Sequence, residues 1–540
     1  MRLLVGIGFA SILFAVVSAS AEDIGTPKGL SPAAATAAAP SGRVGRISVV
    51  SGKVGFRGPG EAIWSDAEVN DPIAGGVSLR TDPQARALIR IGPDTIALTE
   101  SAEIAVANLN DRMSEIAVSH GRIDLDILRL GKGETVQVDI PRGGVWLLQP
   151  GRYDINAGSG DQAPWIAAFT GSARFVGGGA DIAIKAGDRA LLTGSGAAGI
   201  TTEPASADEF AVWCGAHAVD ESRLAAPYFV APAMTGIEAL DAAGSWKADR
   251  KYGEVWVPNA LPADWAPYRY GHWRWVAPWG WSWIDDQAWG FAPSHYGRWA
   301  YLDQHWIWVP GAYTARPVYA PAVVAFLGTP GVGLSYAEGS GPAVAWFPLG
   351  PGEAYWPGYN GDLDYIRGLN AGDIADLGII RLRADGEPAA EIVNAHFANR
   401  QCASVVPRPV FVSGQAVSLG LLQLPLERLE NAPAIMGSPQ IGRPPPPAAA
   451  RVAAAPAIGQ PSPAGHGVAH FAQSTAWARA VHAATIRSRN YQLVARMRGP
   501  HLRVPAYAAG SRPRYEIILR VAHTTHIPRS GEARKKEIRR

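Results

Sequence analysis

The sequence predicts a mainly β protein, in which a β roll, solenoid or sandwich is followed by an antiparallel β repeat domain rich in Trp. Short runs of alternating apolar and polar residues are separated by Gly-, Pro- and Ser-rich turns, as in Arg46–Val50, Ala87–Ile91 and Thr135–Val138. The composition agrees, because 61 Gly, 43 Pro and only 18% charged residues favour short strands and turns over long amphipathic helices.

The N-terminus has the pattern of a cleavable secretory signal. Met1-Arg2 is followed by the apolar run Leu3–Val17 and by Ala19-Ser20-Ala21, an A-x-A cleavage site. The run is shorter than the ~20 residues that span a bilayer, and the clean cleavage site argues against the alternative, a retained anchor. We therefore expect a periplasmic or otherwise extracytoplasmic protein with no transmembrane segment after cleavage.

Changes of pattern divide the chain into seven segments. The connector is expected to be helical because Ser206–Glu209 and Thr235–Glu238 match capping boxes. The predicted segments are a signal peptide (1–21), a flexible lead-in (22–42), a β domain (43–200), a short helical connector (201–245), Trp-rich β repeats (246–312), a β-rich continuation of that domain (313–430) and a disordered tail, Pro/Ala-rich and then Arg-rich (431–540).

The charge is unevenly distributed. From residue 441 onward there are 17 Lys and Arg and three acidic residues, so a tail of +14 follows a body of −12. Such a tail predicts an anionic partner such as an envelope surface, or a tail that folds back on its own acidic body, or a solvated extension without a partner. Export argues against nucleic acid.

Two cysteines occur, Cys214 and Cys402. In an oxidising compartment they could form one disulfide between two domains, although nothing in the sequence requires it. Their separation does not fit a structural zinc site, and His272, His295 and His305 lack the helical spacing of metal ligands. No metal or cofactor is predicted.

Twelve of the 19 tryptophans lie between Trp246 and Trp308. Trp265–Trp273 recurs in degenerate form as Trp289–Trp299, a period near 26 residues that predicts a strand-turn-strand unit used at least twice. The aromatic residues alternate with Arg274, Gly280, Ser282 and Ile307, so we expect them to share one face of each strand.

This aromatic face has two interpretations. The indoles could form a core, because each ring buries roughly 150–250 Å². Alternatively, they could form an exposed platform on which sugar rings stack, while charged side chains bond the hydroxyls. The candidate binding residues are Trp273, Trp275, Trp279, Trp281, Trp283, Trp299, Trp306, Trp308, Tyr270, Tyr296, Arg274 and Arg298, with Tyr268, Tyr301 and Asp285-Asp286 nearby.

Part of the β domain carries a recognisable series of Gly and apolar positions. The series is Val50-Ser-Gly-Lys-Val54, Trp64, Leu79-Arg-Thr81, Ala87–Asp94, Gly121-Arg-Ile123, Ile140–Val145, Pro150-Gly-Arg-Tyr153 and Ala186-Gly187. Over about 150 residues it resembles a FecR-type domain. That family relays signals across envelopes beside a transmembrane helix and a sigma-factor-binding segment, neither of which this sequence shows. The resemblance therefore implies the fold rather than sigma regulation.

A second resemblance runs from about 228 to 415. It rests on Met234–Asp241, Gly244-Ser-Trp246, Tyr252–Pro258, the repeats, Trp308–Gly311, Ala345–Glu353, Tyr365-Ile-Arg367, Phe397–Arg400 and Val406–Val412. These residues resemble the Trp-rich domain of unknown function found beside FecR domains in exported bacterial proteins. The resemblance implies architecture and location, but no chemistry.

No catalytic motif is found. There is no G-x-S-x-G elbow, and Gly45–Lys53 lacks the spacing of a phosphate loop. We therefore expect a non-enzymatic envelope protein, either structural or a glycan- or peptidoglycan-binding module. The alternatives are an enzyme acting on envelope glycans, recognisable by two facing carboxylates, and a signalling module related to FecR regulators.

Overall fold

The computed structural model describes residues 39–158, 162–194, 199–335, 341–384, 386, 388–389, 392 and 396–443. With 39% strand and 15% helix it is mainly β, which confirms the predicted fold class. The expected signal peptide, most of the lead-in and the chain after 443 lie outside the described residues. Within the described ranges, no helix combines the length and the apolar character needed to cross a membrane.

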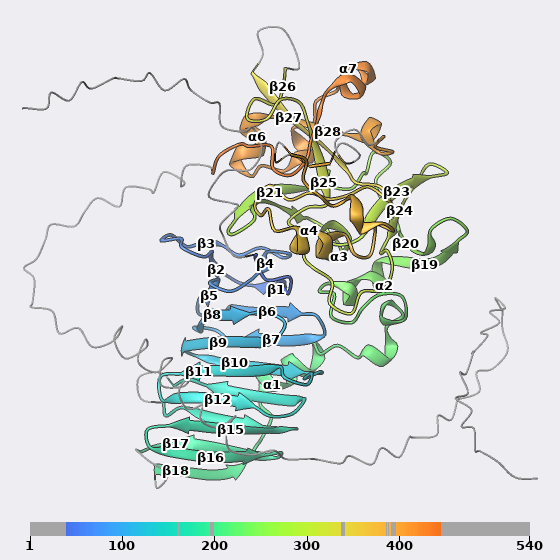
Figure 1. The fold of residues 1–540 in the computed structure, drawn as a ribbon. Coiled ribbons are helices and arrows are strands. Elements are labelled where there is room, and N and C mark those ends of the chain that lie inside the picture. The colour runs from blue at the N-terminus through green and yellow to red at the C-terminus, as the bar shows by residue number, and fades with distance from the viewer. Residues whose placement is uncertain are drawn as a thin grey trace, which may run out of the picture. The chain divides into compact units, whose positions relative to one another are not determined.

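The described residues of the first part form a sandwich of two nine-stranded sheets (Figure 1). In spatial order the first sheet contains β18 (Ile200–Pro204), β17 (Asp188–Leu192), β14 (Trp165–Ala168), β13 (Gly151–Asn156), β10 (Arg122–Ile127), β7 (Asp94–Leu98), β6 (Arg86–Ile91), β1 (Gly45–Ser51) and β4 (Pro72–Ile73). The second contains β16 (Ala180–Lys185), β15 (Ser172–Gly177), β12 (Gly143–Leu147), β11 (Thr135–Ile140), β9 (Met113–His120), β8 (Glu103–Leu109), β5 (Ser78–Thr81), β2 (Val54–Arg57) and β3 (Ser65–Asp66).

The sandwich forms because its strands alternate between apolar and polar residues. The chain passes back and forth between the sheets, so that successive strands stack from β1 to β18 (Figure 1). Ile47, Leu79, Val138 and Ile184 are among the fully buried residues of the core between the two sheets. Of the three predicted possibilities, roll, solenoid and sandwich, the structure adopts the sandwich.

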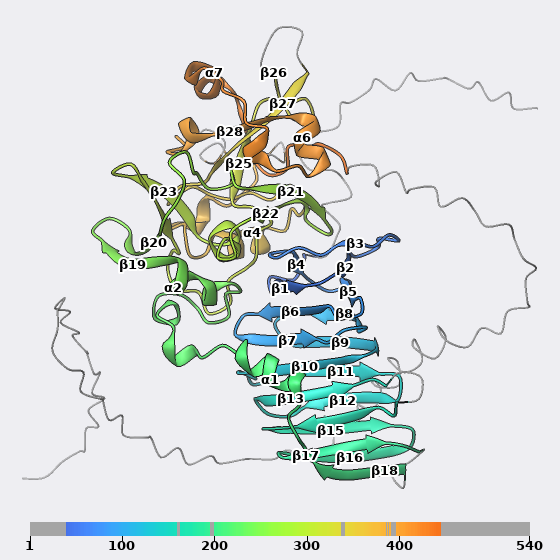
Figure 2. The same cartoon turned by 180° about the vertical axis from the view of Figure 1, so that it is seen from behind.

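The connector contains short helices and runs beside the first sheet (Figure 2). Arg122 of β10 forms an ion pair with Asp208, Arg152 of β13 donates to the Ala211 carbonyl and Arg86 of β6 pairs with Glu209. The helical elements are α1 (Glu209–Ala216), η2 (Glu221–Arg223), η3 (Ala226–Tyr228), η4 (Ile237–Ala239) and α2 (Leu240–Ala243).

Both predicted capping boxes were wrong in detail. Asp208, not Ser206, caps α1 by accepting a hydrogen bond from the Ala211 amide. Thr235 donates to the Val44 carbonyl and accepts from the Gly92 amide, so its hydroxyl joins the connector to the sandwich.

In the Trp-rich part, the described residues form three smaller sheets. The first has the order β19 (Gly244–Asp249), β20 (Gly253–Pro258), β24 (His305–Val309) and β23 (Arg298–Leu302), and the second is the hairpin β21 (Gly271–Val276) and β22 (Gly280–Asp285). The third joins β26 (Leu334–Ser335), β27 (Pro342–Pro348), β25 (Val324–Leu327) and β29 (Ala434–Ile435), with β28 (Ser404–Pro407) paired to β27. Its helices are α3 (Phe291–His295), α4 (Leu363–Asn370), η5 (Leu377–Ile379), η6 (Arg400–Cys402), α6 (Arg408–Ser413), η7 (Val417–Leu419) and α7 (Leu426–Asn431).

The start of the predicted tail is ordered. β29 pairs with β25, and the indole nitrogen of Trp281 donates to the Ile441 carbonyl at 2.9 Å. Ile435 and Ile441 are buried in the aromatic core, which explains why 431–443 does not behave as the expected disordered segment.

Buried charges join the sandwich to the Trp-rich part. Glu238 lies 2.6 Å from the Arg46 guanidinium and 3.6 Å from that of Arg90. Arg274 of β21 contacts both carboxylate oxygens of Asp71 at 2.8 Å. Because a buried charge is tolerated only when it is paired, these contacts make the two parts dependent on each other.

Candidate functional site

The two Trp-containing hairpins confirm the predicted repeat and alternation. In β21 and β22, Trp273 lies opposite Trp283 and Trp275 opposite Trp281, while Arg274 faces Ser282 on the other side. β23 and β24 repeat the unit. The aromatic side chains of each hairpin therefore share one face.

That face is the core of the Trp-rich part, so of the two interpretations the structure supports the core rather than the exposed platform. Among the candidate binding residues, Trp275 and Tyr270 are half-buried and the other aromatic side chains are buried, whereas the neighbouring Tyr301 is exposed. Pairs such as Trp273–Trp346 and Trp273–Trp283 meet edge to face with ring centroids 5.3 and 5.6 Å apart, the packing that aromatic cores favour. The buried members of the predicted set are Trp273, Trp279, Trp281, Trp283, Trp299, Trp306, Trp308 and Tyr296.

The two predicted arginines also have structural partners. Arg298 is buried and bonds to Asp373 at 3.0 Å and to the Asn370 side chain at 2.8 Å. Arg274 stacks on Phe56 of the sandwich, with its guanidinium carbon 4.8 Å from the ring centroid. Neither guanidinium is presented to a ligand on an aromatic surface.

Both cysteines are free, so the possible disulfide is not formed. Cys214 packs against Ala97 and Phe210, whereas Cys402 packs against the aromatic core. Burial raises the pKa of both thiols, which makes them poor nucleophiles.

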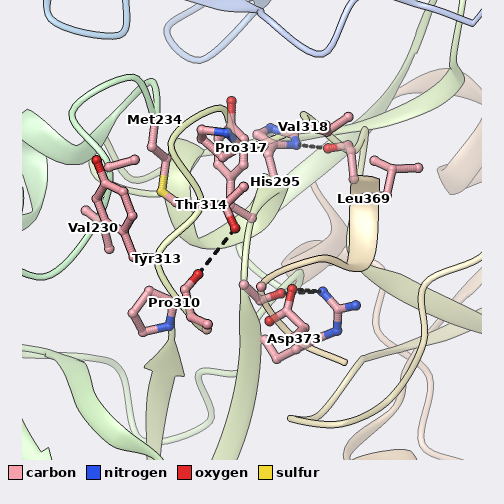
Figure 3. Close-up of a pocket in the computed structure, with 18 of the residues that line it drawn as sticks. Val230, Met234, His295, Pro310, Tyr313, Thr314, Pro317, Val318, Leu369 and Asp373 are labelled. Atoms are coloured by element: carbon pink, nitrogen blue, oxygen red, sulfur yellow. Dashed lines mark hydrogen bonds and ion pairs between the residues drawn. The ribbon is translucent and has the colours of Figure 1, made fainter. Parts of the chain in front are cut away.

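A small cavity lies against His295, Met234, Tyr313 and Asp373 (Figure 3). Its volume of about 40 Å³ is enough for water but not for a sugar or a peptide. His295 is buried beside it, with Nδ1 2.7 Å from the Ala320 carbonyl, and burial lowers its pKa to about 3. We therefore regard it as a neutral core histidine.

A larger groove of about 570 Å³ opens in the Trp-rich part. Three segments form it: the loop that follows β20 (259–270), the tip of the β23–β24 hairpin, and η6. Its volume falls in the usual range for small-ligand sites, roughly 300–1,000 Å³. The lining residues are Val257, Pro258, Ala260, Leu261, Pro262, Ala263, Asp264, Trp265, Ala266, Arg269, Tyr301, Gln304, His305, Trp306 and Cys402.

The hairpin tip supplies the aromatic side of the groove. A two-residue turn, Asp303-Gln304, has φ of 47° and 63° at its two positions and leaves Leu302 opposite His305. Tyr301 is therefore placed opposite Trp306, with ring centroids 5.1 Å apart. Tyr301 is 45% exposed whereas Trp306 is buried, so this aromatic row begins in the core and ends at the surface.

The loop after β20 supplies the polar side. The carboxylate of Asp264 is exposed and accepts a hydrogen bond from the Tyr270 hydroxyl at 2.6 Å, which lowers the pKa of the acid and raises that of the phenol. Arg269 is half-buried, and desolvation lowers the pKa of its guanidinium. A groove with a stacking ring, an acceptor and a cation can recognise a polyhydroxylated ligand.

The sequence interpretation named Tyr301 and Tyr270 but missed Asp264, Gln304 and His305 as a set. A two-residue turn between aromatic strands was the available signal, because it predicts an exposed tip. Among the described residues, no three His, Cys, Asp or Glu side chains cluster in a way that could hold a metal ion.

Fold and site together define a mainly β protein, with a sandwich joined to an aromatic-core domain that carries an open groove. Residues 237–353 match a family of unknown function, DUF6600. No curated protein matches.

Two crystal structures of a candidate anti-sigma factor from Parabacteroides distasonis ATCC 8503 match at 10% and 11% identity, each with a TM-score of 0.23. Each match covers 25% of this chain and 64% or 63% of the solved chain, which is less than two thirds of that protein's length. A TM-score this low does not define a shared fold.

Proposed function

We propose that this protein is a non-enzymatic, exported cell-envelope protein that binds envelope glycan in the groove beside Tyr301. One observation carries this proposal. The aromatic row of the β23–β24 hairpin is buried at Trp306 but exposed at Tyr301, which lines an open groove with polar side chains. The planar face of a tyrosine packs well against the C–H face of a sugar ring, and the buried indoles behind it restrict its motion.

The groove fits binding better than hydrolysis. Its lining contains one carboxylate, Asp264, whereas most glycosidases use a facing pair of carboxylates. Glycan hydrolysis by this groove would therefore need an acid or base from elsewhere.

The envelope location is supported by the secretory signal pattern at residues 1–21 and by the resemblance of the β domain to FecR-type domains. The basic residues after 441 favour additional electrostatic attachment to an anionic envelope surface. On this proposal the groove determines which glycan is bound, and the basic tail adds a salt-sensitive contribution to the affinity for the envelope.

Co-sedimentation of the mature protein with purified peptidoglycan tests the proposal. We expect Tyr301→Ala to reduce retention by roughly tenfold, the effect of losing one stacking contact. Tyr228→Ala is the matched control, because Tyr228 is 83% exposed but lies in η3, outside the groove. Equal retention of the two variants, or no retention of the wild type, would overturn the proposal. A chain ending at Arg443 is expected to lose the salt-sensitive part of retention only.

A further inference from the structure

Arg269 differs in its partners from Arg298 and Arg274, the two arginines that the sequence predicted to bind a ligand. Arg298 is paired with Asp373 and Arg274 with Asp71. Arg269 is half-buried, yet no described carboxylate lies within 4.0 Å of its guanidinium. Asp264 lines the same groove and attracts this half-buried cation at longer range, but no described carboxylate is in direct contact with it.

Among the described residues, the hydrogen bonds of Arg269 go to neutral oxygens. Nε donates to the Ser404 hydroxyl at 3.3 Å, Nη1 to the Asp264 carbonyl at 2.6 Å and Nη2 to the Cys402 carbonyl at 3.4 Å. A guanidinium has five N–H donors, so one donor remains on each terminal nitrogen. One N–H group on each terminal nitrogen can form a bidentate pair with a carboxylate.

We propose that the groove takes a saccharide bearing a carboxylate, which pairs with Arg269 while the sugar ring stacks on Tyr301. This inference rests on the proposed glycan-binding function and adds the chemical class of the ligand. Asp264, Gln304 and His305 line the same groove and offer acceptors and donors for hydroxyl groups. A neutral sugar would leave Arg269 without a carboxylate in direct contact, whereas a carboxylated sugar would supply one.

Isothermal titration of the full mature protein with matched saccharides tests the inference. The probes are the disaccharide of N-acetylglucosamine and N-acetylmuramic acid, which carries a carboxylate, and chitobiose, which lacks it. A charge-assisted hydrogen-bond pair predicts a roughly tenfold lower Kd for the acidic disaccharide. Oligogalacturonate, an acidic saccharide from another source, distinguishes a peptidoglycan ligand from an acidic polysaccharide.

Variants assign this preference to the two residues. Arg269→Gln is expected to equalise the acidic and neutral disaccharides, whereas Tyr301→Ala weakens both. Arg250→Gln, at an exposed position in the β19–β20 turn, is the control and should behave as wild type. Arg269→Lys keeps the positive charge but removes the bidentate geometry, so it is the second test of this residue if Arg269→Gln does not fold.

The outcomes separate this inference from the proposed function. Equal affinity of wild type for chitobiose and the acidic disaccharide would overturn the carboxylate preference and leave glycan binding in place. A preference that survives in Arg269→Gln would also overturn the assignment. Failure of all the saccharides to bind would overturn both.

Discussion

At the residue scale, burial separates the indoles that stabilise the fold from the ring that faces the groove. Trp308 is fully buried and its indole nitrogen donates to the Tyr296 carbonyl at 2.9 Å. We expect Trp308→Ala to lower the free energy of unfolding by about 3–5 kcal/mol, because it leaves a cavity and an unpaired carbonyl. Tyr301→Ala should cost less than about 1 kcal/mol. Urea unfolding followed by circular dichroism measures both, and similar losses for the two variants would contradict this division.

Asp285 gives a second prediction at the same scale. It accepts hydrogen bonds from the Trp283 indole and the Gln287 amide, but burial raises its pKa from 3.8 to about 7. Since the folded protein holds this proton more tightly than the unfolded chain, the stabilising contribution is complete below pH 3.8 and is lost as the pH rises through about 7.

Asp285→Asn cannot ionise and therefore removes this pH dependence. We expect the free energy of unfolding of the wild type to rise relative to that of the variant when the pH falls from about 8 to about 5. These two pH values lie about one unit or more on either side of the raised pKa. A stability difference that is the same at both pH values would show that the carboxyl does not titrate as described.

At the element scale, the β23–β24 hairpin sets the shape of the groove. Asp303 and Gln304 both have positive φ, a conformation that Asn-Gly adopts with less strain. Replacing the pair with Asn-Gly should raise stability by about 0.5–1 kcal/mol. Thermal unfolding measures the change. A lower melting temperature would contradict the prediction and show that the side chains of Asp303 and Gln304 stabilise the turn.

At the scale of the whole molecule, Glu238 is the central charge between the sandwich and the Trp-rich part. Glu238→Gln leaves Arg46 and Arg90 buried without a shared anion, so we expect a loss of about 3–5 kcal/mol and separate unfolding transitions of the two parts in calorimetry. Glu209→Gln is the control, because Glu209 pairs with Arg86 but is exposed. If both variants unfold like the wild type, the buried charges do not couple the parts.

The sequence predicted strands better than it predicted surfaces. Alternation placed Trp273 and Trp283 on one face, but periodicity does not tell whether that face is covered by another element; here Trp346 and Phe411 cover it. Glu238 matched a capping pattern, yet its partners Arg46 and Arg90 are almost 200 and 150 residues away in the chain, and no local rule predicts such a pairing.

The groove could not be predicted from the sequence, because it also depends on contacts between distant segments. Asp264, Tyr301 and Cys402 come from separate segments that only the tertiary fold brings together. That no described carboxylate directly contacts the Arg269 guanidinium is a property of the folded protein, and composition or spacing does not reveal it.

Hydroxyl-radical footprinting with and without peptidoglycan fragments tests most directly the claim that the indoles are core and the groove is the binding site. We predict that Tyr301 and His305 are modified in the free protein and protected by the glycan, while Trp273, Trp283 and Trp308 stay unmodified in both states. Modification of these indoles in the free protein, or glycan protection that leaves Tyr301 unchanged, would contradict the account.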